Sequence, residues 1–405
     1  LVIAIIFCIC YSYQFLYVIV SLMKKDKPHQ ETKAHRFAVL IAARNEETVI
    51  NHLIDSINTQ TYDQGEVTVF VVADNCTDQT AACARKMGAI VYERFDQTKI
   101  GKGHAMEFLL NQMEKDYAPF DGYFVFDADN VLDQNYILEM NKTFSDGYDI
   151  ITSYRNSKNY GDNWISSGYA IWFLWESEFL NRGRMLLGTS CAVSGTGFFF
   201  SRRIIEKYGG WKFFLLTEDI QFTVDNVLSG EKIGYCRQAM LYDEQPVKFQ
   251  QSFRQRMRWA KGFFQVFHRY GLDLFKGSLQ RNTSCYDMLM VIMPAIILTL
   301  FTLIFNGSMI LFGDYTTYQD DLIMMMMGRM ILNMYFMLVF IATVTIATQW
   351  KNIHTTSFKK LAYIFTFPFF MFTYIPITIV AFFKKVEWQP IEHSRAKTLA
   401  EIKEG

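Results

Sequence analysis

Acidic side chains stand directly behind two short apolar runs of this 405-residue chain. Asp127 and Asp129 follow the run Tyr123–Phe126, and Asp74 follows Val67–Ala73. Two carboxylates at the end of a strand supply the oxygen ligands that a hard divalent cation prefers, and such a cation neutralises a diphosphate. Because a lone Asp-x-Asp pair is common on protein surfaces, it is the position behind an apolar strand that favours a cation–diphosphate site.

Two later motifs also carry side chains suited to catalysis. Thr217–Asp219 (Thr-Glu-Asp) follows a Gly-rich aromatic segment, Ser194–Phe200, and by itself fits a helix N-cap with acidic residues in the first turn. Gln255–Trp259 (Gln-Arg-Met-Arg-Trp) lies in an amphipathic stretch that fits a helix lying on anionic lipid. A helix at a membrane surface can also border an active site, so the two interpretations of this motif are compatible.

The elements that would position these residues are predicted by an alternation of apolar runs and helical periodicity. The expected strands are Phe37–Ala42, Val67–Ala73, Ile90–Tyr92 and Tyr123–Phe126, and the expected helices are Glu46–Gln60, a segment from Thr77 to near Gly88, and His104–Met113. This β-α-β-α order predicts a parallel, doubly wound sheet whose ligands bind at the carboxyl ends of the strands. The sequence contains neither a G-x-G-x-x-G pattern nor a P-loop, so a dinucleotide site is not supported.

Composition narrows the class of protein. Hydrophobic residues make up 51% of the chain and charged residues only 20%, which is less polar than a typical soluble protein. Lysine and arginine (40) balance aspartate and glutamate (40), which argues against a general nucleic-acid binder, and 16% aromatic residues exclude a disordered chain. The seven cysteines are scattered without a C-x-x-C pair, so we expect reduced thiols and neither a zinc site nor a disulfide framework.

The apolar residues gather at the two ends of the chain. Leu1–Met23, Met288–Phe312 and Leu322–Thr348 are each long enough to cross a bilayer, and the lysines after the first of them place its exit in the cytoplasm. The fourth apolar stretch, Leu361–Phe383, contains two prolines and has lysines on both sides. This combination predicts a bent or re-entrant hairpin that returns to the cytoplasm.

The basic residues of the C-terminal tail favour the cytoplasmic side. We expect Trp388–Pro390 to lie close to the catalytic region or to the membrane surface. The predicted units are an N-terminal transmembrane helix (1–23), a cytosolic α/β domain (24–248), an amphipathic interfacial segment (249–283), a transmembrane region (284–385) and a cytosolic tail (386–405).

The order of these motifs before a membrane cluster resembles the membrane-integrated family 2 glycosyltransferases, the group that includes the cellulose, chitin, hyaluronan and poly-N-acetylglucosamine synthases. The resemblance implies a GT-A-like, Rossmann-related cytosolic domain with transmembrane and interfacial helices, in a multi-pass protein of a bacterial plasma membrane. This chain departs from the family pattern at Asn75, where Asp or Gly is common, and at Ser194–Gly197, where Cys-Gly-Ser/Thr is usual.

The resemblance also implies the chemistry, an inverting single displacement with a UDP-sugar donor, either UDP-glucose or UDP-N-acetylglucosamine. A Mg²⁺ or Mn²⁺ ion is the implied cofactor, with Asp129 as the expected direct ligand, and Asp219 is the implied general base. The remaining implied roles are uridine and ribose binding by Arg44, Glu46, Asp74 and Lys102, cation–diphosphate binding by Asp127 and Asp129, contacts to diphosphate or acceptor by Glu218, Gln255 and Arg258, and acceptor stacking by Trp259.

Three functions compete at this stage. The leading hypothesis is a processive synthase that extends a β-linked polysaccharide through its own membrane helices, with accessory export or modification proteins as further partners. The alternative is a non-processive enzyme that adds one sugar to a lipid acceptor. The third, an inactive membrane scaffold or transporter component, is disfavoured because every expected catalytic carboxylate is present.

Overall fold

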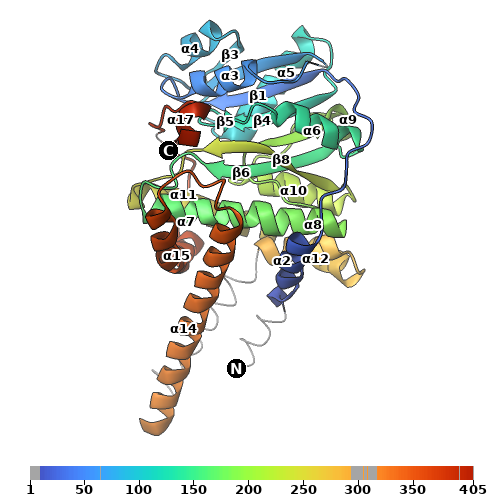
Figure 1. Cartoon of the computed structure of the whole chain (residues 1–405). Coiled ribbons are helices and arrows are strands. Elements are labelled where there is room, and N and C mark those ends of the chain that lie inside the picture. Colours follow the sequence, from blue (N-terminus) through green and yellow to red (C-terminus); the bar gives the residue numbers. More distant parts are fainter. Residues whose placement is uncertain are drawn as a thin grey trace.

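A single eight-stranded sheet forms the centre of the molecule in the computed structural model, which describes residues 10–63, 65–292, 304, 308, 317–391 and 393–404 (Figure 1). The strand order is β3-β2-β1-β4-β7-β6-β8-β5. The strands are β1 (Phe37–Ala43), β2 (Val67–Asp74), β3 (Ile90–Arg94), β4 (Gly122–Asp127), β5 (Val131–Leu132), β6 (Ile150–Ser157), β7 (Phe198–Ser201) and β8 (Ile233–Asp243). The helices of this domain are α3 (Ile50–Asn58), α4 (Thr80–Lys86), α5 (Lys102–Asp116), α6 (Tyr136–Ser145), α9 (Arg202–Tyr208) and α10 (Glu218–Leu228).

The prediction of a parallel sheet is right for one half of it and wrong for the other. Strands β3, β2, β1 and β4 run parallel, and each contains the apolar run expected from the sequence. Strand β7 then pairs antiparallel with both β4 and β6, so the second half is mixed. The antiparallel strand enters because Phe198–Ser201 comes back beside β4 from the far side of a long helical insertion, a course that the parallel alternation did not predict.

A layer of helices lies beyond β6 and β8, on the side of the sheet away from β3 (Figure 1). It contains α7 (Trp164–Trp175), the π-helix η1 (Glu176–Asn181), α8 (Arg182–Leu187) and the long α11 (Phe249–Leu279). Asn163 starts α7 with a capping box, since its side chain accepts hydrogen bonds from the backbone N–H groups of Ile165 and Ser166. This layer is the part of the domain that faces the apolar ends of the chain.

A buried ion pair ties the first apolar helix to this layer. The guanidinium of Arg184 in α8 donates to both carboxylate oxygens of Asp287 in α12 (Thr283–Ile292), at 2.7 and 3.0 Å. Tyr13 and Tyr17 of α2 (Tyr13–Met23) donate their hydroxyls to the same carboxylate. Because Arg184 and Asp287 are both 1% exposed, the hydroxyls complete the partners that a buried charge pair requires.

Two apolar helical stretches of the described residues are long enough to cross a membrane, Met324–Thr348 in α14 (Thr317–Thr348) and Ser357–Phe383. They correspond to the third and fourth predicted spans. The predicted span Leu1–Met23 is described only from Cys10, and most of Met288–Phe312 lies outside the described residues. Figure 1 shows α14 projecting away from the domain.

The fourth stretch is bent and stays against the domain. It divides at Thr373 into α15 (Ser357–Phe372) and α16 (Tyr374–Phe383), with Pro368 inside α15. At its start, the Lys359 ammonium donates to the carbonyl of Gly161 at 2.8 Å. At its end, the Lys261 ammonium of α11 reaches the carbonyl of Phe382 at 3.4 Å.

The C-terminal tail folds back over the sheet and ends in α17 (Leu399–Glu404). Ile402 is buried against Val131 and Tyr242, and Lys403 pairs with Asp133 at 2.7 Å. Residues 388–390 of the tail line a cavity of the α/β domain, in agreement with the expectation that Trp388–Pro390 lie close to it. The six described cysteines (Cys10, Cys76, Cys83, Cys191, Cys236 and Cys285) are free thiols.

Candidate active site

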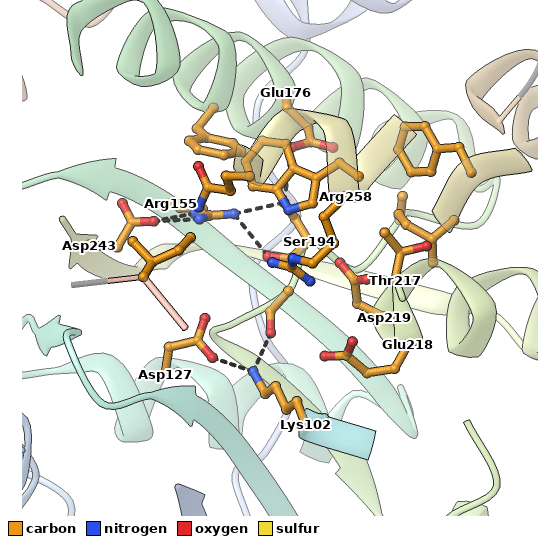
Figure 2. A pocket seen from close by; sticks show the side chains of 18 of the residues that line it. Lys102, Asp127, Arg155, Glu176, Ser194, Thr217, Glu218, Asp219, Asp243 and Arg258 are labelled. Carbon is orange, nitrogen blue, oxygen red and sulfur yellow. Dashed lines mark hydrogen bonds and ion pairs between the residues drawn. The ribbon is translucent and has the colours of Figure 1, made fainter. Parts of the chain in front are cut away.

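All the residues singled out from the sequence line one cavity of about 470 Å³ at the carboxyl ends of β1, β2 and β4 (Figure 2). The set comprises Arg44, Glu46, Asp74, Lys102, Asp127, Asp129, Glu218, Asp219, Gln255, Arg258 and Trp259. The parallel half of the sheet brings the first six together, because its strands end at the same edge. The roles assigned to these residues remain predictions, whereas their shared position is a property of the fold.

Lys102 and Asp127 mark one end of the cavity. The Lys102 ammonium, at the start of α5, lies 2.5 Å from Asp127 and 2.8 Å from the carbonyl oxygen of Gly195 (Figure 2). Burial by itself would lower the pKa of Lys102, but the carboxylates of Asp127 and Glu218 outweigh it and raise the pKa. The lysine is therefore a fixed positive charge, suited to an anionic ligand.

Asp74 is held by a buried arginine. Arg94 at the end of β3 donates to the Asp74 carboxylate at 2.5 Å, and both side chains are 7% exposed. The next residue, Asn75, has a φ of +54°, a left-handed conformation that Gly and Asn adopt more readily than other residues. Asn therefore fits the left-handed turn that follows Asp74 at the end of β2.

Asp127 and Asp129 fit a hard divalent cation by the chemistry of their donor atoms. Asp129 is 4% exposed, and its Oδ2 accepts a hydrogen bond from the backbone N–H of Glu244 at 2.8 Å. Among the described residues no cluster of three or more His, Cys, Asp or Glu side chains is arranged around one metal position. A cation held here would take its other ligands from the diphosphate and from water, as Mg²⁺ usually does.

The C-terminal tail supplies two residues of this cavity that the sequence analysis did not assign to it. Nδ1 of His393 lies 3.0 Å from both carboxylate oxygens of Glu46, and the Arg44 guanidinium lies 5.2 Å from the ring centre of Trp388. Burial opposes the charge on His393, but Asp129 and Glu46 outweigh it and raise its pKa to about 10. The sequence analysis expected Trp388–Pro390 to lie near the domain but assigned no role in the site to Trp388 or His393.

Glu218 and Asp219 begin α10 on another wall of the cavity (Figure 2). The N-cap interpretation of this motif is incomplete, because the Thr217 side chain makes no capping bond and its buried Oγ1 has no hydrogen-bond partner among the described residues. Burial, together with the neighbouring Asp219, raises the pKa of Glu218 to about 7. Burial likewise raises the pKa of Asp219, so this pair binds protons more tightly than exposed carboxylates do.

Helix α11 brings Gln255, Arg258 and Trp259 to the same wall. Arg258 donates to the carbonyl of Leu216 at 3.0 Å, and a Cβ at Gly262 would lie 2.5 Å from the Thr217 side chain. The glycine therefore permits the close approach of α11 to the start of α10. The half-buried Trp259 ring meets Tyr169 edge to face, with centroids 5.7 Å apart.

A second buried ion pair was also missed. Arg155 in β6 donates to Asp243, the last residue of β8, at 2.7 Å and to the carbonyl of Ser194 at 3.1 Å (Figure 2). Its guanidinium carbon lies 3.6 Å from the ring centre of Phe173. Burial raises the pKa of Asp243 to about 6 even with Arg155 beside it. The sequence analysis missed this pair because it predicted neither β6 nor β8, the strands that carry Arg155 and Asp243.

Comparison with known proteins places this geometry in a family. A family model described as "Glycosyltransferase like family 2" matches residues 35–262. The probable glycosyltransferase YdaM of Bacillus subtilis (strain 168) is 25% identical over 62% of this chain and 60% of its own length. The beta-monoglucosyldiacylglycerol synthase of Nostoc sp. is 26% identical over 64% of this chain and 56% of its own. The poly-beta-1,6-N-acetyl-D-glucosamine synthase of Staphylococcus aureus (strain COL) is 22% identical over 66% and 63%.

These matches span about six tenths of the length of each relative. Among solved structures, the mannosyltransferase PcManGT from Pyrobaculum calidifontis, in complex with GDP-Man and Mn²⁺, has the same fold. The TM-score is 0.61 at 14% identity, and the alignment covers 93% of this chain and 98% of that one.

Proposed function

This chain belongs to the family 2 glycosyltransferases and is a transferase, and we propose that it moves a sugar from a UDP-sugar to the free end of a β-linked polysaccharide. The observation that supports this proposal is the shared cavity, in which Asp127 and Asp129 lie at one end and Asp219 at another. A diphosphate bound at the first end would place the sugar's anomeric carbon toward Asp219. The similarity to a poly-N-acetylglucosamine synthase supports the polymer acceptor.

In this mechanism the acceptor hydroxyl attacks the anomeric carbon while the bond to the diphosphate oxygen breaks. Asp219 accepts the hydroxyl proton, and its raised pKa suits a group that must take up a proton in the transition state. Lys102 and Arg258 provide positive charge for the departing nucleoside diphosphate. One displacement inverts the configuration of the sugar and yields the β-linkage.

Asp127 and Asp129 would hold a Mg²⁺ or Mn²⁺ ion, which supplies charge neutralisation for the diphosphate. The solved glycosyltransferase of the same fold, PcManGT, contains Mn²⁺ with its donor sugar, which supports this assignment. Arg44, Glu46 and Asp74 are proposed to contact the nucleoside, and Gln255 the diphosphate or the acceptor. Trp259 is proposed to stack on the acceptor sugar and to let the product slide after each addition.

A second candidate is the transfer of one sugar to a membrane lipid. The similarity to beta-monoglucosyldiacylglycerol synthases favours it, at a slightly higher identity than the polysaccharide synthase. Both candidates place the catalytic domain on the cytoplasmic face of a membrane, held there by α14 and by the bent pair α15–α16.

Product size and donor choice test the proposal together. The full chain in detergent, with Mg²⁺ or Mn²⁺ and radiolabelled UDP-glucose, UDP-N-acetylglucosamine or GDP-mannose, should release UDP and form a long polymer. If the chain instead adds one sugar to added diacylglycerol and forms no polymer, the lipid-acceptor candidate is correct. If the nucleoside diphosphate is released from GDP-mannose alone, the assignment of a UDP-sugar donor is wrong. If it is released from no donor, the hypothesis of an inactive scaffold is favoured.

A further inference from the structure

Glu176 is a carboxyl group of the cavity that the proposed reaction does not yet use. It is partly exposed, lines the cavity, and lies across from the Lys102–Asp127 end in Figure 2. Burial raises the pKa of Glu176, and the nearby Asp219 carboxylate raises it further against the opposing effect of Arg184 and Arg155. A carboxyl group that lines a cavity in an environment unfavourable to its charge is a candidate for ligand binding.

The backbone at Glu176 has an unusual geometry. Glu176 is the first residue of the π-helix η1, which stands between α7 and α8 without a break in the helical course. A π-helix accommodates one more residue per turn than an α-helix would, and such segments often occur at functional sites. The insertion changes the direction in which successive side chains of the segment point.

The two acids of this π-helix have different surroundings. Glu178 is buried, and its carboxylate accepts hydrogen bonds from Arg182 at 2.7 Å and from Arg237 at 2.7 and 2.9 Å. Glu176 has one weak donor, the Ser194 hydroxyl at 3.2 Å from its Oε2, and no ion pair among the described residues. Glu178 therefore serves the fold, whereas Oε1 of Glu176 has no protein donor in that same part of the chain and belongs to the cavity.

The cations nearest to Glu176 are already engaged. Arg155 is paired with Asp243, and Arg184 is paired with Asp287. A carboxylate accepts hydrogen bonds and cannot donate them, so Oε1, on the wall of the cavity, is suited to accept from a hydroxyl of a ligand bound there.

We propose that Glu176 binds a second hydroxyl of the acceptor, beside the hydroxyl that Asp219 deprotonates, so that the acceptor is the end of a sugar chain and not a single-hydroxyl lipid. This inference rests on the proposed function and selects one of its two acceptor classes. A pyranose offers several hydroxyl donors around a ring whose face can pack on Trp259. Diacylglycerol offers one hydroxyl, which Asp219 takes, and ester oxygens that only accept.

The test compares transfer to three acceptors, chitotriose, cellotriose and dioctanoylglycerol, by the full chain in detergent. Glu176→Gln removes the charge and keeps the shape. We expect it to raise the KM of the better oligosaccharide about tenfold or more, since a hydrogen bond to a charged group is stronger than one to a neutral group. The dissociation constant of UDP, measured by calorimetry, should stay within about twofold, which a merely structural role would not produce.

Two matched variants separate acceptor binding from packing. Glu178→Gln, two residues away in the same π-helix, should lower the melting temperature and leave the oligosaccharide KM unchanged. Ser194→Ala removes the protein donor to Glu176 but keeps its carboxylate, and should raise that KM less than Glu176→Gln does.

Three results would overturn the inference. They are an oligosaccharide KM within twofold of wild type in Glu176→Gln, a parallel loss of UDP affinity, or transfer by the wild-type chain to dioctanoylglycerol alone. In the last case the assignment as a glycosyltransferase still stands. If the wild-type chain transfers sugar to no acceptor and releases no nucleotide, the proposed function fails as well.

Discussion

The two ends of the cavity hold their charges in opposite ways. At the end that we propose binds the nucleotide, three pairs combine charges of opposite sign: Lys102–Asp127, Arg94–Asp74 and His393–Glu46. On the walls that we propose bind the acceptor, burial raises the pKa values of three carboxyl groups, Glu176, Glu218 and Asp219. The charges of the first region are largely paired within the protein, whereas the carboxyl groups of the second bind protons more tightly than exposed carboxylates do.

This difference matches two kinds of chemistry. A nucleoside diphosphate with its cation brings both signs of charge, so it can exchange with existing ion pairs at a small net cost. A sugar hydroxyl brings no charge and must lose a proton, so it needs a carboxylate of raised pKa. Four substitutions test this contrast between the two regions of the cavity.

Asp219→Asn should have the largest effect and should act on the acceptor end alone. The amide has nearly the same shape but cannot accept the proton, so we expect the transfer rate to fall about 10²- to 10⁴-fold. UDP affinity, measured by calorimetry, should change little. Retention of more than about a tenth of the wild-type rate would remove Asp219 from the role of base.

Asp129→Ala should break the nucleotide end instead. Loss of a carboxylate ligand should weaken UDP binding in the presence of Mn²⁺ by about 10- to 100-fold, a range that even outer-shell changes reach at metal sites. Chelation by EDTA should lower activity in the same way, with recovery on addition of Mg²⁺ or Mn²⁺. Full activity in chelator would contradict the assignment of Asp127 and Asp129.

Glu218→Gln should change the pH dependence. Asp219 must be unprotonated to act, so transfer is lost as the pH falls through its pKa, which burial places above the ordinary aspartate value. Removing the adjacent negative charge lets Asp219 ionise more easily, and the acidic limb of kcat/KM should move about one unit lower. An unmoved limb would show that the two carboxyl groups do not titrate as a pair.

Trp259→Ala should have the smallest effect, a rise in the acceptor KM of about 2- to 10-fold, with Trp259→Phe in between. UDP affinity should stay unchanged, and product length should shorten. If nucleotide affinity falls while product length is retained, the indole has been assigned to the wrong end of the cavity.

The nucleotide end was predictable because its signals are local. Phe37, Val69 and Phe124 belong to apolar runs that read as buried strands, and the acids follow within a residue or two. A local sequence pattern detects both features because each apolar strand and the acidic residue that follows it are adjacent in the chain.

The remainder depends on contacts that no local pattern encodes. Strand β7 is only four residues long, and β8 interrupts its apolar run with Arg237 and Gln238, so neither stood out as a strand. The π-helix at Glu176 lies within an aromatic stretch that fits an ordinary helix. His393 contacts Glu46 although 347 residues separate them in the sequence, and no local sequence pattern at either residue predicts the contact.

Hydrogen bonds and ion pairs hold both ends of the apolar helices to the domain, and this limits the number of times that the chain between them can cross a membrane. Asp287 is fixed to Arg184, and just after α14 the Gln349 carbonyl oxygen Oε1 accepts from Tyr154 at 2.6 Å. If the domain lies on one face of a membrane, a chain that leaves it and returns to it must cross an even number of times, so a crossing by α14 would require a second one between these points. The same count applies from Lys359 to His393, where a path of α15–α16 through the membrane would have to enter and leave on one face, although their length would permit a straight crossing.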